Sequence, residues 1–185
     1  MDNENGRNSA RQAQLHASRV RLFQVLCALD GVGEITEPEI ESKFSEMYVA
    51  SPVDEKKKGK EESEQTSILE AAEVSEEPDE EEDIEEISAK EFRATCRTVF
   101  DLRSHIKEID ALINEYSLSW RLDRMNLVDR NAIRLAVYES LIKKKKVPIA
   151  VAISEAVIIA HEFGSVESPR FVNGVLAKIV HAPER

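Results

Sequence analysis

The sequence has little of the material that β-rich or membrane-spanning proteins need. Only six glycines, six prolines and 5% aromatic residues occur among 185 residues, too few for the turns of a β sandwich or barrel. The most apolar stretch, residues 147–160, is short and contains Glu155, so no membrane-spanning segment is expected. The opening residues lack the pattern of a signal peptide. We therefore expect a soluble, cytoplasmic protein.

Patterns for catalysis and metal binding are also missing. The two cysteines, Cys27 and Cys96, lie far apart without CxxC spacing, which excludes a zinc knuckle and argues against a disulfide framework. The four histidines share no ligand spacing, and no glycine-rich phosphate loop or GxSxG motif occurs. The sequence predicts that the protein is not an enzyme and uses no metal or cofactor.

The net charge of −11 belongs to one segment of the chain. Residues 51–90 contain 16 acidic side chains and five lysines, so they account for the whole acidic surplus. The remaining 145 residues carry 20 acidic and 20 basic side chains. This remainder is neutral and does not repel a polyanion.

Apolar residues recur at helical spacing on both sides of the acidic segment. Leucines three, four or seven residues apart form a first helix that Gly31 ends, and Thr36 is placed to cap a second helix. Further apolar stripes begin at Ser88, and a strongly apolar helix, residues 127–142, belongs in the middle of a bundle because it is apolar on most sides. The predicted fold is all-α, with six or seven helices.

The same patterns divide the chain into four segments. We expect a flexible N-terminus at 1–10, the first helices at 11–50, an acidic, low-complexity, disordered insertion at 51–87, and the remaining helices at 88–181. The insertion has too few large apolar residues to offset the entropy lost on folding. It is expected to be either an inert linker or a built-in polyanion that competes with a polyanionic ligand of the folded part.

Three strings in the C-terminal half carry a specific resemblance. They are NLVDRNAIRLAVYESL, VPIAVAISEAVIIAHEFG and SPRFVNGVLAKIV, which in this order and spacing resemble the NusB family of transcription antitermination factors. RLFQVLCALDG, at residues 21–31, resembles the first helix of that family. The resemblance implies two three-helix bundles. It also implies binding of boxA RNA in ribosomal-RNA transcripts together with the ribosomal protein NusE, and action on RNA polymerase, without catalysis or cofactor.

The resemblance also implies two groups of RNA-binding residues. Single-stranded RNA needs cations for phosphates, planar groups for stacking and polar groups for base edges. The first helix supplies cations on its solvent face, and the N–H groups at the start of the last helix favour a phosphate. The corresponding residues are Arg11, His16, Arg19, Arg21 and Gln24, together with Ser168, Arg170 and Phe171. A plain solvated face explains the first group as an alternative, and core packing explains Phe171 equally well.

Three charged residues correspond to the surface that the family uses for NusE. They are Asp129, Arg130 and Arg134, and their i, i+4 spacing places the two arginines on one helix face. A simple surface ion pair, which contributes little energy, accounts for the same residues.

Two other functions stay open at this point. The helical domain is similar to the RNA-targeting part of rRNA methyltransferases, although the GxGxxG-type cofactor loop of such an enzyme is not found in this sequence. The chain also fits a protein–protein adaptor that has lost RNA binding, because its arginine face is thinner than the usual cluster of the family. Titration of boxA-like RNA with and without NusE separates the adaptor from an RNA-binding factor.

Overall fold

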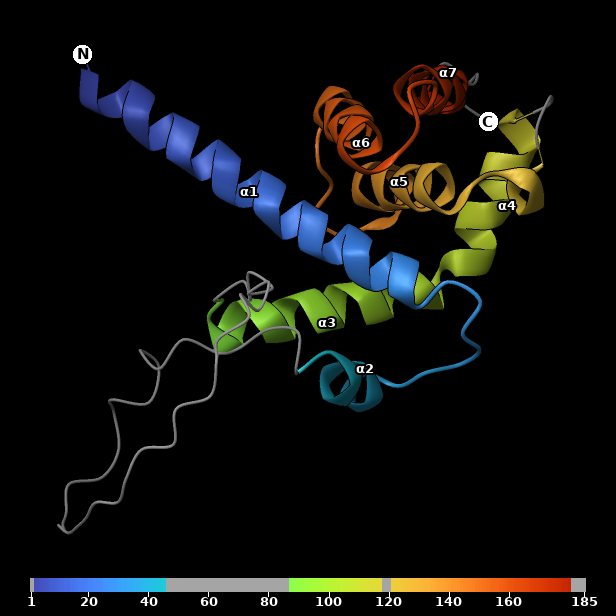
Figure 1. Cartoon of the computed structure of the whole chain (residues 1–185), viewed down its shortest axis with the longest axis horizontal. Helices are drawn as coiled ribbons and strands as arrows, with labels where there is room; N and C mark the ends of the chain where they lie inside the picture. The colour runs from blue at the N-terminus through green and yellow to red at the C-terminus, as the bar shows by residue number, and fades with distance from the viewer. Residues whose placement is uncertain (1, 46–86, 118–120, 181–185) are drawn as a thin grey trace, which may run out of the picture.

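The computed structural model describes residues 2–45, 87–117 and 121–180, and the regular structure of these ranges is helical. The α-helices are α1 (Asp2–Ala28), α2 (Glu37–Phe44), α3 (Ala89–Ser104), α4 (Ile106–Tyr116), α5 (Leu127–Val137), α6 (Ile149–Phe163) and α7 (Ser168–Val180) (Figure 1). A 3₁₀ turn, η2 (Leu122–Arg124), precedes α5, and a π-helical turn, η3 (Tyr138–Ile142), follows it. The insertion predicted at 51–87 lies outside the described residues except for Ile87.

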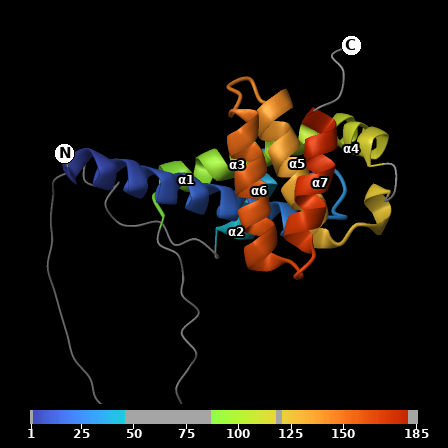
Figure 2. The ribbon, with the colours of Figure 1, turned by 90° about the horizontal axis from the view of Figure 1, so that it is seen from above.

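The helices form two groups that α1 joins. α1, α2 and α3 pack together, while α5, α6 and α7 form a second group against which α4 also packs (Figures 1 and 2). α1 contacts α5 and α6 as well, and so connects the groups. The all-α prediction with two three-helix bundles is confirmed, with α4 as an additional helix.

Local capping contacts set two helix boundaries, and the predicted cap at Thr36 is confirmed. Thr36 caps α2, and its backbone N–H donates to Glu39 Oε2 at 2.8 Å, which lowers the pKa of that carboxyl. Ser88 caps α3 in the same manner, because its Oγ accepts from Glu91 N–H at 3.3 Å. These reciprocal contacts satisfy backbone donors that a helix start otherwise leaves unpaired.

α1 is longer than predicted. It begins at Asp2 instead of Arg11, so residues 2–10, expected to form a flexible end, are helical. Every residue from Gly6 to Leu15 is exposed, and this part of α1 extends beyond the other helices (Figures 1 and 2). The apolar spacing did not reveal it, because this part of the helix packs no face into the core.

α5 occupies the centre of the molecule. Every residue from Asn131 to Ser140 is buried, and α1, α4, α6 and α7 all pack against the helix. The prediction that the helix at 127–142 lies in the middle of a bundle is confirmed. The buried stretch also includes charged side chains, among them Arg134 and Glu139.

The turn between α6 and α7 has no room for a side chain at Gly164. A Cβ atom there would lie 2.5 Å from the carbonyl oxygen of Ala160 and 2.6 Å from Ser168 Cβ. Gly164→Ala is therefore expected to lower the free energy of unfolding by about 1–3 kcal/mol, the usual cost of overpacking. Urea denaturation followed by circular dichroism measures this change.

Gly174→Ala is the matched control for Gly164→Ala. Gly174 lies within α7, and a Cβ atom there meets nothing within 4 Å. Alanine favours a helix over glycine, so this variant should be more stable by roughly 0.5–1 kcal/mol. Equal destabilisation of both variants would contradict the close approach at Gly164.

Candidate nucleic-acid interface

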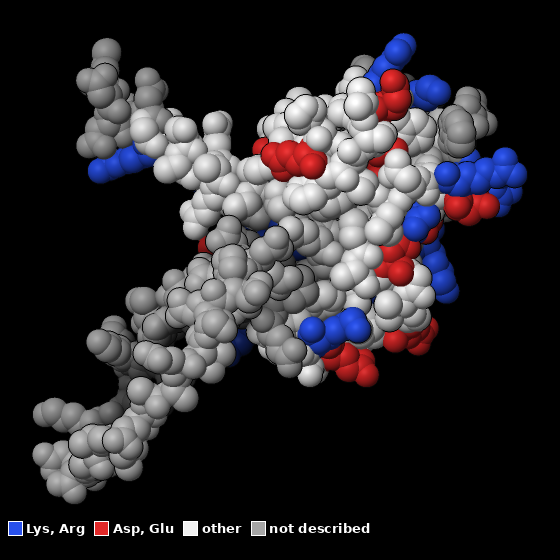
Figure 3. Space-filling view, viewed as in Figure 1, with Lys and Arg blue, Asp and Glu red and all other residues white. Residues whose placement is uncertain are grey.

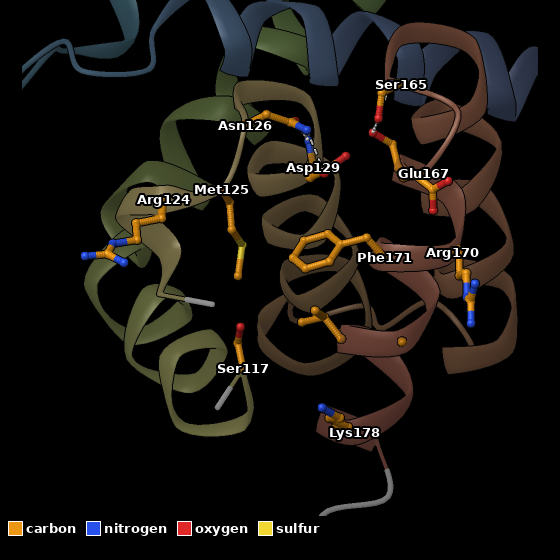
Figure 4. Close-up of a pocket in the computed structure, with 13 residues that line it drawn as sticks. Ser117, Arg124, Met125, Asn126, Asp129, Ser165, Glu167, Arg170, Phe171 and Lys178 are labelled. Atoms are coloured by element: carbon orange, nitrogen blue, oxygen red, sulfur yellow. Dashed lines mark hydrogen bonds between the residues drawn. The ribbon is translucent and has the colours of Figure 1, made fainter. Parts of the chain in front are cut away.

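A groove with a volume of about 910 Å³ opens between α4, η2, the start of α5 and α7 (Figure 4). Its walls come from segments that are far apart in the sequence. The lining residues are Ser117, Arg124, Met125, Asn126, Asp129, Ser165, Glu167, Ser168, Arg170, Phe171, Gly174, Val175 and Lys178. The fold therefore joins three of the predicted site residues on α7, Ser168, Arg170 and Phe171, with Asp129 on α5.

An aromatic ring and a buried carboxylate face the interior of this groove. The ring of Phe171 points from α7 toward Met125, and its side chain is half-buried against the core (Figure 4). Asp129 is 5% exposed, and its Oδ2 accepts from Asn126 Nδ2 at 2.7 Å. Its Oδ1 has no hydrogen-bond partner among the described residues. This oxygen is the unpaired buried acceptor among the residues that line the groove.

The rim of the groove carries exposed cations. Arg124, Arg170 and Lys178 are exposed, and Glu167 adds one carboxylate to the same rim. Figure 4 shows Arg124 and Arg170 on opposite sides, both pointing outward. On the face shown in Figure 3, Lys and Arg side chains gather toward α4 and α7 beside acidic ones. This arrangement suits a strand whose phosphates follow the rim while a base enters the groove.

The start of α7 differs from the predicted phosphate site. Ser168 is 1% exposed, and its Oγ accepts from the backbone N–H of Ser165 at 3.0 Å. The N–H groups of Ser168 and Phe171 already donate to the carbonyl oxygens of Ser165 and Glu167. Ser168 therefore shapes the turn, and its predicted contact with RNA stays a prediction.

The predicted solvent face of α1 is wrong at two arginines. Arg19 is 7% exposed and Arg21 is 4% exposed, because the neighbouring helices cover both side chains. Arg19 Nε donates to Glu139 Oε2 at 2.8 Å. Arg11 and Gln24 are exposed, as expected, but they are separated by about 20 Å along the helix, given its rise per residue.

The predicted partner surface on α5 is largely committed to internal ion pairs. Arg134 Nε and Nη2 each donate to an oxygen of Asp110 at 2.7 Å, and Nη1 donates to Asp30 at 3.1 Å. Arg130 also donates to Asp30, at 3.0 Å. The two arginines share a face, as predicted, but the end of α1 and α4 cover it, so a surface role for Arg134 is wrong.

Several of these residues could not be predicted from the sequence. Asp30, Asp110 and Arg103 stand in unrelated segments, and only the fold shows that the first two bind Arg134. Arg103 donates to the carbonyl oxygens of Leu29, Val32 and Gly33, which satisfies the end of α1. Arg124 and Lys178 were not predicted as site residues either, because a single exposed cation forms no recognisable sequence motif.

The described residues offer little for covalent or metal chemistry. Burial raises the pKa of Cys27 and of Cys96 to about 11, so both thiols stay protonated at neutral pH. No group of three or more His, Cys, Asp or Glu side chains within the described ranges is placed to hold a metal ion. None of the described helices combines the length and apolarity needed to cross a membrane.

The fold and the groove define an all-helical, two-bundle protein with an aromatic-lined groove whose rim carries cations. The NusB family profile matches residues 53–181, and the chain belongs to the NusB family. The match begins after the first two helices, so it does not include residues 21–31. It does include the three C-terminal strings, whose resemblance to NusB is thereby confirmed.

Individual relatives support the same family. The transcription antitermination protein NusB of Desulforudis audaxviator is 41% identical over 98 residues, which is 53% of this chain and 70% of that protein. The chain spans between 53% and 73% of the length of other NusB proteins that it matches.

Solved structures extend the likeness to the first helices. NusB of Thermotoga maritima has a TM-score of 0.59 and 28% identity, covering 91% of this chain and 92% of that one. A structure described as antitermination factors NusB and NusE in complex with dsRNA has a TM-score of 0.58 at 23% identity, covering 91% and 97%. The second likeness concerns the fold alone.

Proposed function

We propose that this chain is an antitermination factor that binds boxA-type single-stranded RNA of ribosomal-RNA transcripts together with NusE, and acts with them on cytoplasmic RNA polymerase. The groove carries the proposal, because it combines an aromatic ring, a buried acceptor and rim cations in one concave site. Family membership supports it, and so does the solved complex of a similarly folded NusB with NusE and RNA.

The groove offers three different contacts to one nucleotide. A base can stack on Phe171, which presents its ring to the groove. The vacant Oδ1 of Asp129 accepts a hydrogen bond, so it favours a base edge with an exocyclic amine, as in cytosine or adenine. The phosphates on either side then lie toward Arg170 and Lys178 on the rim.

Substitutions in α7 test this binding mode. Phe171→Leu keeps an apolar side chain against the core but removes the ring. Loss of one stacked base costs about 1–3 kcal/mol, so the affinity for boxA-like RNA should fall roughly fivefold to 150-fold, with little change in melting temperature.

Arg170→Ala should weaken RNA binding and flatten the log–log salt dependence of the binding constant by about 0.7.

Fluorescence titration of labelled boxA-like RNA, with and without NusE, provides the measurement. The neutral folded part offers few phosphate contacts, so RNA binding should be weak alone and tighter with NusE. His161→Gln on exposed α6 surface is the control and should bind like the wild type. Absence of RNA binding in both titrations would favour the adaptor without RNA affinity.

A further inference from the structure

His16 lies between two carboxylates where α1 crosses α6. Its Nδ1 is 2.8 Å from Glu155 Oε2, and its Nε2 is 3.3 Å from Glu162 Oε2. The imidazole and Glu155 are largely covered, whereas Glu162 is 41% exposed. Both ring nitrogens therefore face an acceptor-only group.

The protonation state of the imidazole decides whether both contacts can exist. A neutral imidazole has one N–H group, so it donates to one carboxylate and turns a lone pair toward the other. The imidazolium donates to both. The hydrogen bond to Glu155 raises the pKa of His16 above its ordinary value of 6.5, although burial opposes this change. The doubly bonded form is thus populated near neutral pH.

Other charged groups also lie around His16. Arg19, one turn further along α1, donates to Glu139 of η3 and lies 3.9 Å from Glu155. Histidine is the side chain whose ordinary pKa lies close to neutral pH, so His16 is the group of this cluster that we consider as the switch.

His16 also marks the point where α1 leaves the second helix group. Every residue from Gly6 to Leu15 is exposed, and this arm, residues 6–15, extends past the other helices (Figures 1 and 2). The arm has an exposed hydrogen bond from Gln14 to Glu91 of α3. It carries the exposed Arg7 and Arg11.

We propose that His16, Glu155 and Glu162 form a proton-dependent latch that fixes the direction of the arm relative to α6. The latch is closed when both ring nitrogens carry protons. When the imidazole loses a proton, the contact between Nε2 and the exposed Glu162 is lost first. Because the folded pKa is raised, the stabilisation is complete below the ordinary pKa and is lost as the pH rises through the folded value. An effect of the latch on RNA affinity, through Arg7 and Arg11 of the arm, rests on the proposed function.

Hydrogen exchange of the full chain tests the latch without RNA. Protection factors, which correct for the intrinsic pH dependence of exchange, are measured for the amides of residues 10–18 at pH 6 and pH 8. In the wild type they should fall at least about threefold on going to pH 8, because one charge-assisted hydrogen bond is lost. Constant protection factors would overturn the latch.

Glu162→Gln distinguishes the latch from a merely structural contact. A glutamine amide can donate to Nε2 of neutral imidazole while Nδ1–H still donates to Glu155. This variant should therefore keep its protection at pH 8 and lose most of the pH dependence. Glu162→Ala should be less protected at pH 6, and His161→Gln, which removes an exposed histidine from the same helix, should behave like the wild type. A Glu162→Gln profile as steep as that of the wild type would refute the proposal.

The RNA titration is then repeated at pH 6 and pH 8. The wild type should bind boxA-like RNA at least about twofold more tightly at pH 6, and Glu162→Gln should bind equally at both values. Absence of RNA binding at either pH would overturn the proposed function, while the exchange data would still decide the latch.

Discussion

Arg134→Ala should lower the free energy of unfolding by about 3–5 kcal/mol, the usual cost of removing one partner from a buried ion pair. The guanidinium is bidentate to Asp110 at 2.7 Å and also donates to Asp30 at 3.1 Å. Only 11% of the Arg134 side chain and 13% of that of Asp30 is exposed. The variant leaves Asp110 without this partner and Asp30 with one cation fewer. α1, α4 and α5 lose their shared contact.

Chemical denaturation measures the effect, and Arg121→Ala is the control. Arg121 pairs with Asp123, but both side chains are mostly exposed, so its loss should change stability by less than about 1 kcal/mol. Arg134→Met combined with Asp110→Leu should recover much of the stability, because it removes both charges of the bidentate pair. A denaturation midpoint of Arg134→Ala equal to that of the wild type would contradict the structural role.

This expectation also changes how partner binding must be tested. Loss of NusE binding in Arg134→Ala would report unfolding and not a lost contact at the interface. Asp129 needs the same care, because it lines the groove while its Oδ2 accepts from Asn126 Nδ2 at the start of α5. Binding studies of the α5 surface therefore need a stability measurement for each variant.

The sequence predicted those parts of the fold that depend on neighbouring residues. Thr36 and Ser88 cap helices because the acceptor and the reciprocal glutamate lie three residues apart. The central position of α5 followed from its apolar character on most sides. Such signals are contained within one or two turns of helix, so the sequence alone was sufficient.

The sequence could not decide which polar face of a helix stays exposed. Arg134 is on the predicted face of α5, but Asp30 and Asp110 come from other segments and cover it. Phe171 has a spacing that fits both the core and a binding site, and in the structure its side chain packs on the core and also lines the groove. These outcomes depend on how distant helices pack, which local spacing does not contain.

Arg19→Ala is expected to have the second large effect, again about 3–5 kcal/mol in the free energy of unfolding. Arg19 Nε donates to Glu139 Oε2 at 2.8 Å, and the two side chains are only 8% and 6% exposed. Removal of the guanidinium leaves Glu139 buried in η3 without this cation. The ion pair joins α1 to the second helix group, so the variant should also weaken the contact between the two groups.

Arg11→Ala separates stability from RNA binding on the same helix. Arg11 is exposed in the arm, so its loss should leave the denaturation midpoint unchanged and flatten the log–log salt dependence of RNA binding by about 0.7 if it contacts a phosphate.

Arg19→Met with Glu139→Leu should recover the stability that Arg19→Ala loses, because it removes the buried charge pair as a whole. An Arg19→Ala variant that keeps its stability but binds RNA weakly would overturn the buried role. It would restore Arg19 to the RNA-binding face, because only an exposed guanidinium can be lost without leaving a buried carboxylate unpaired.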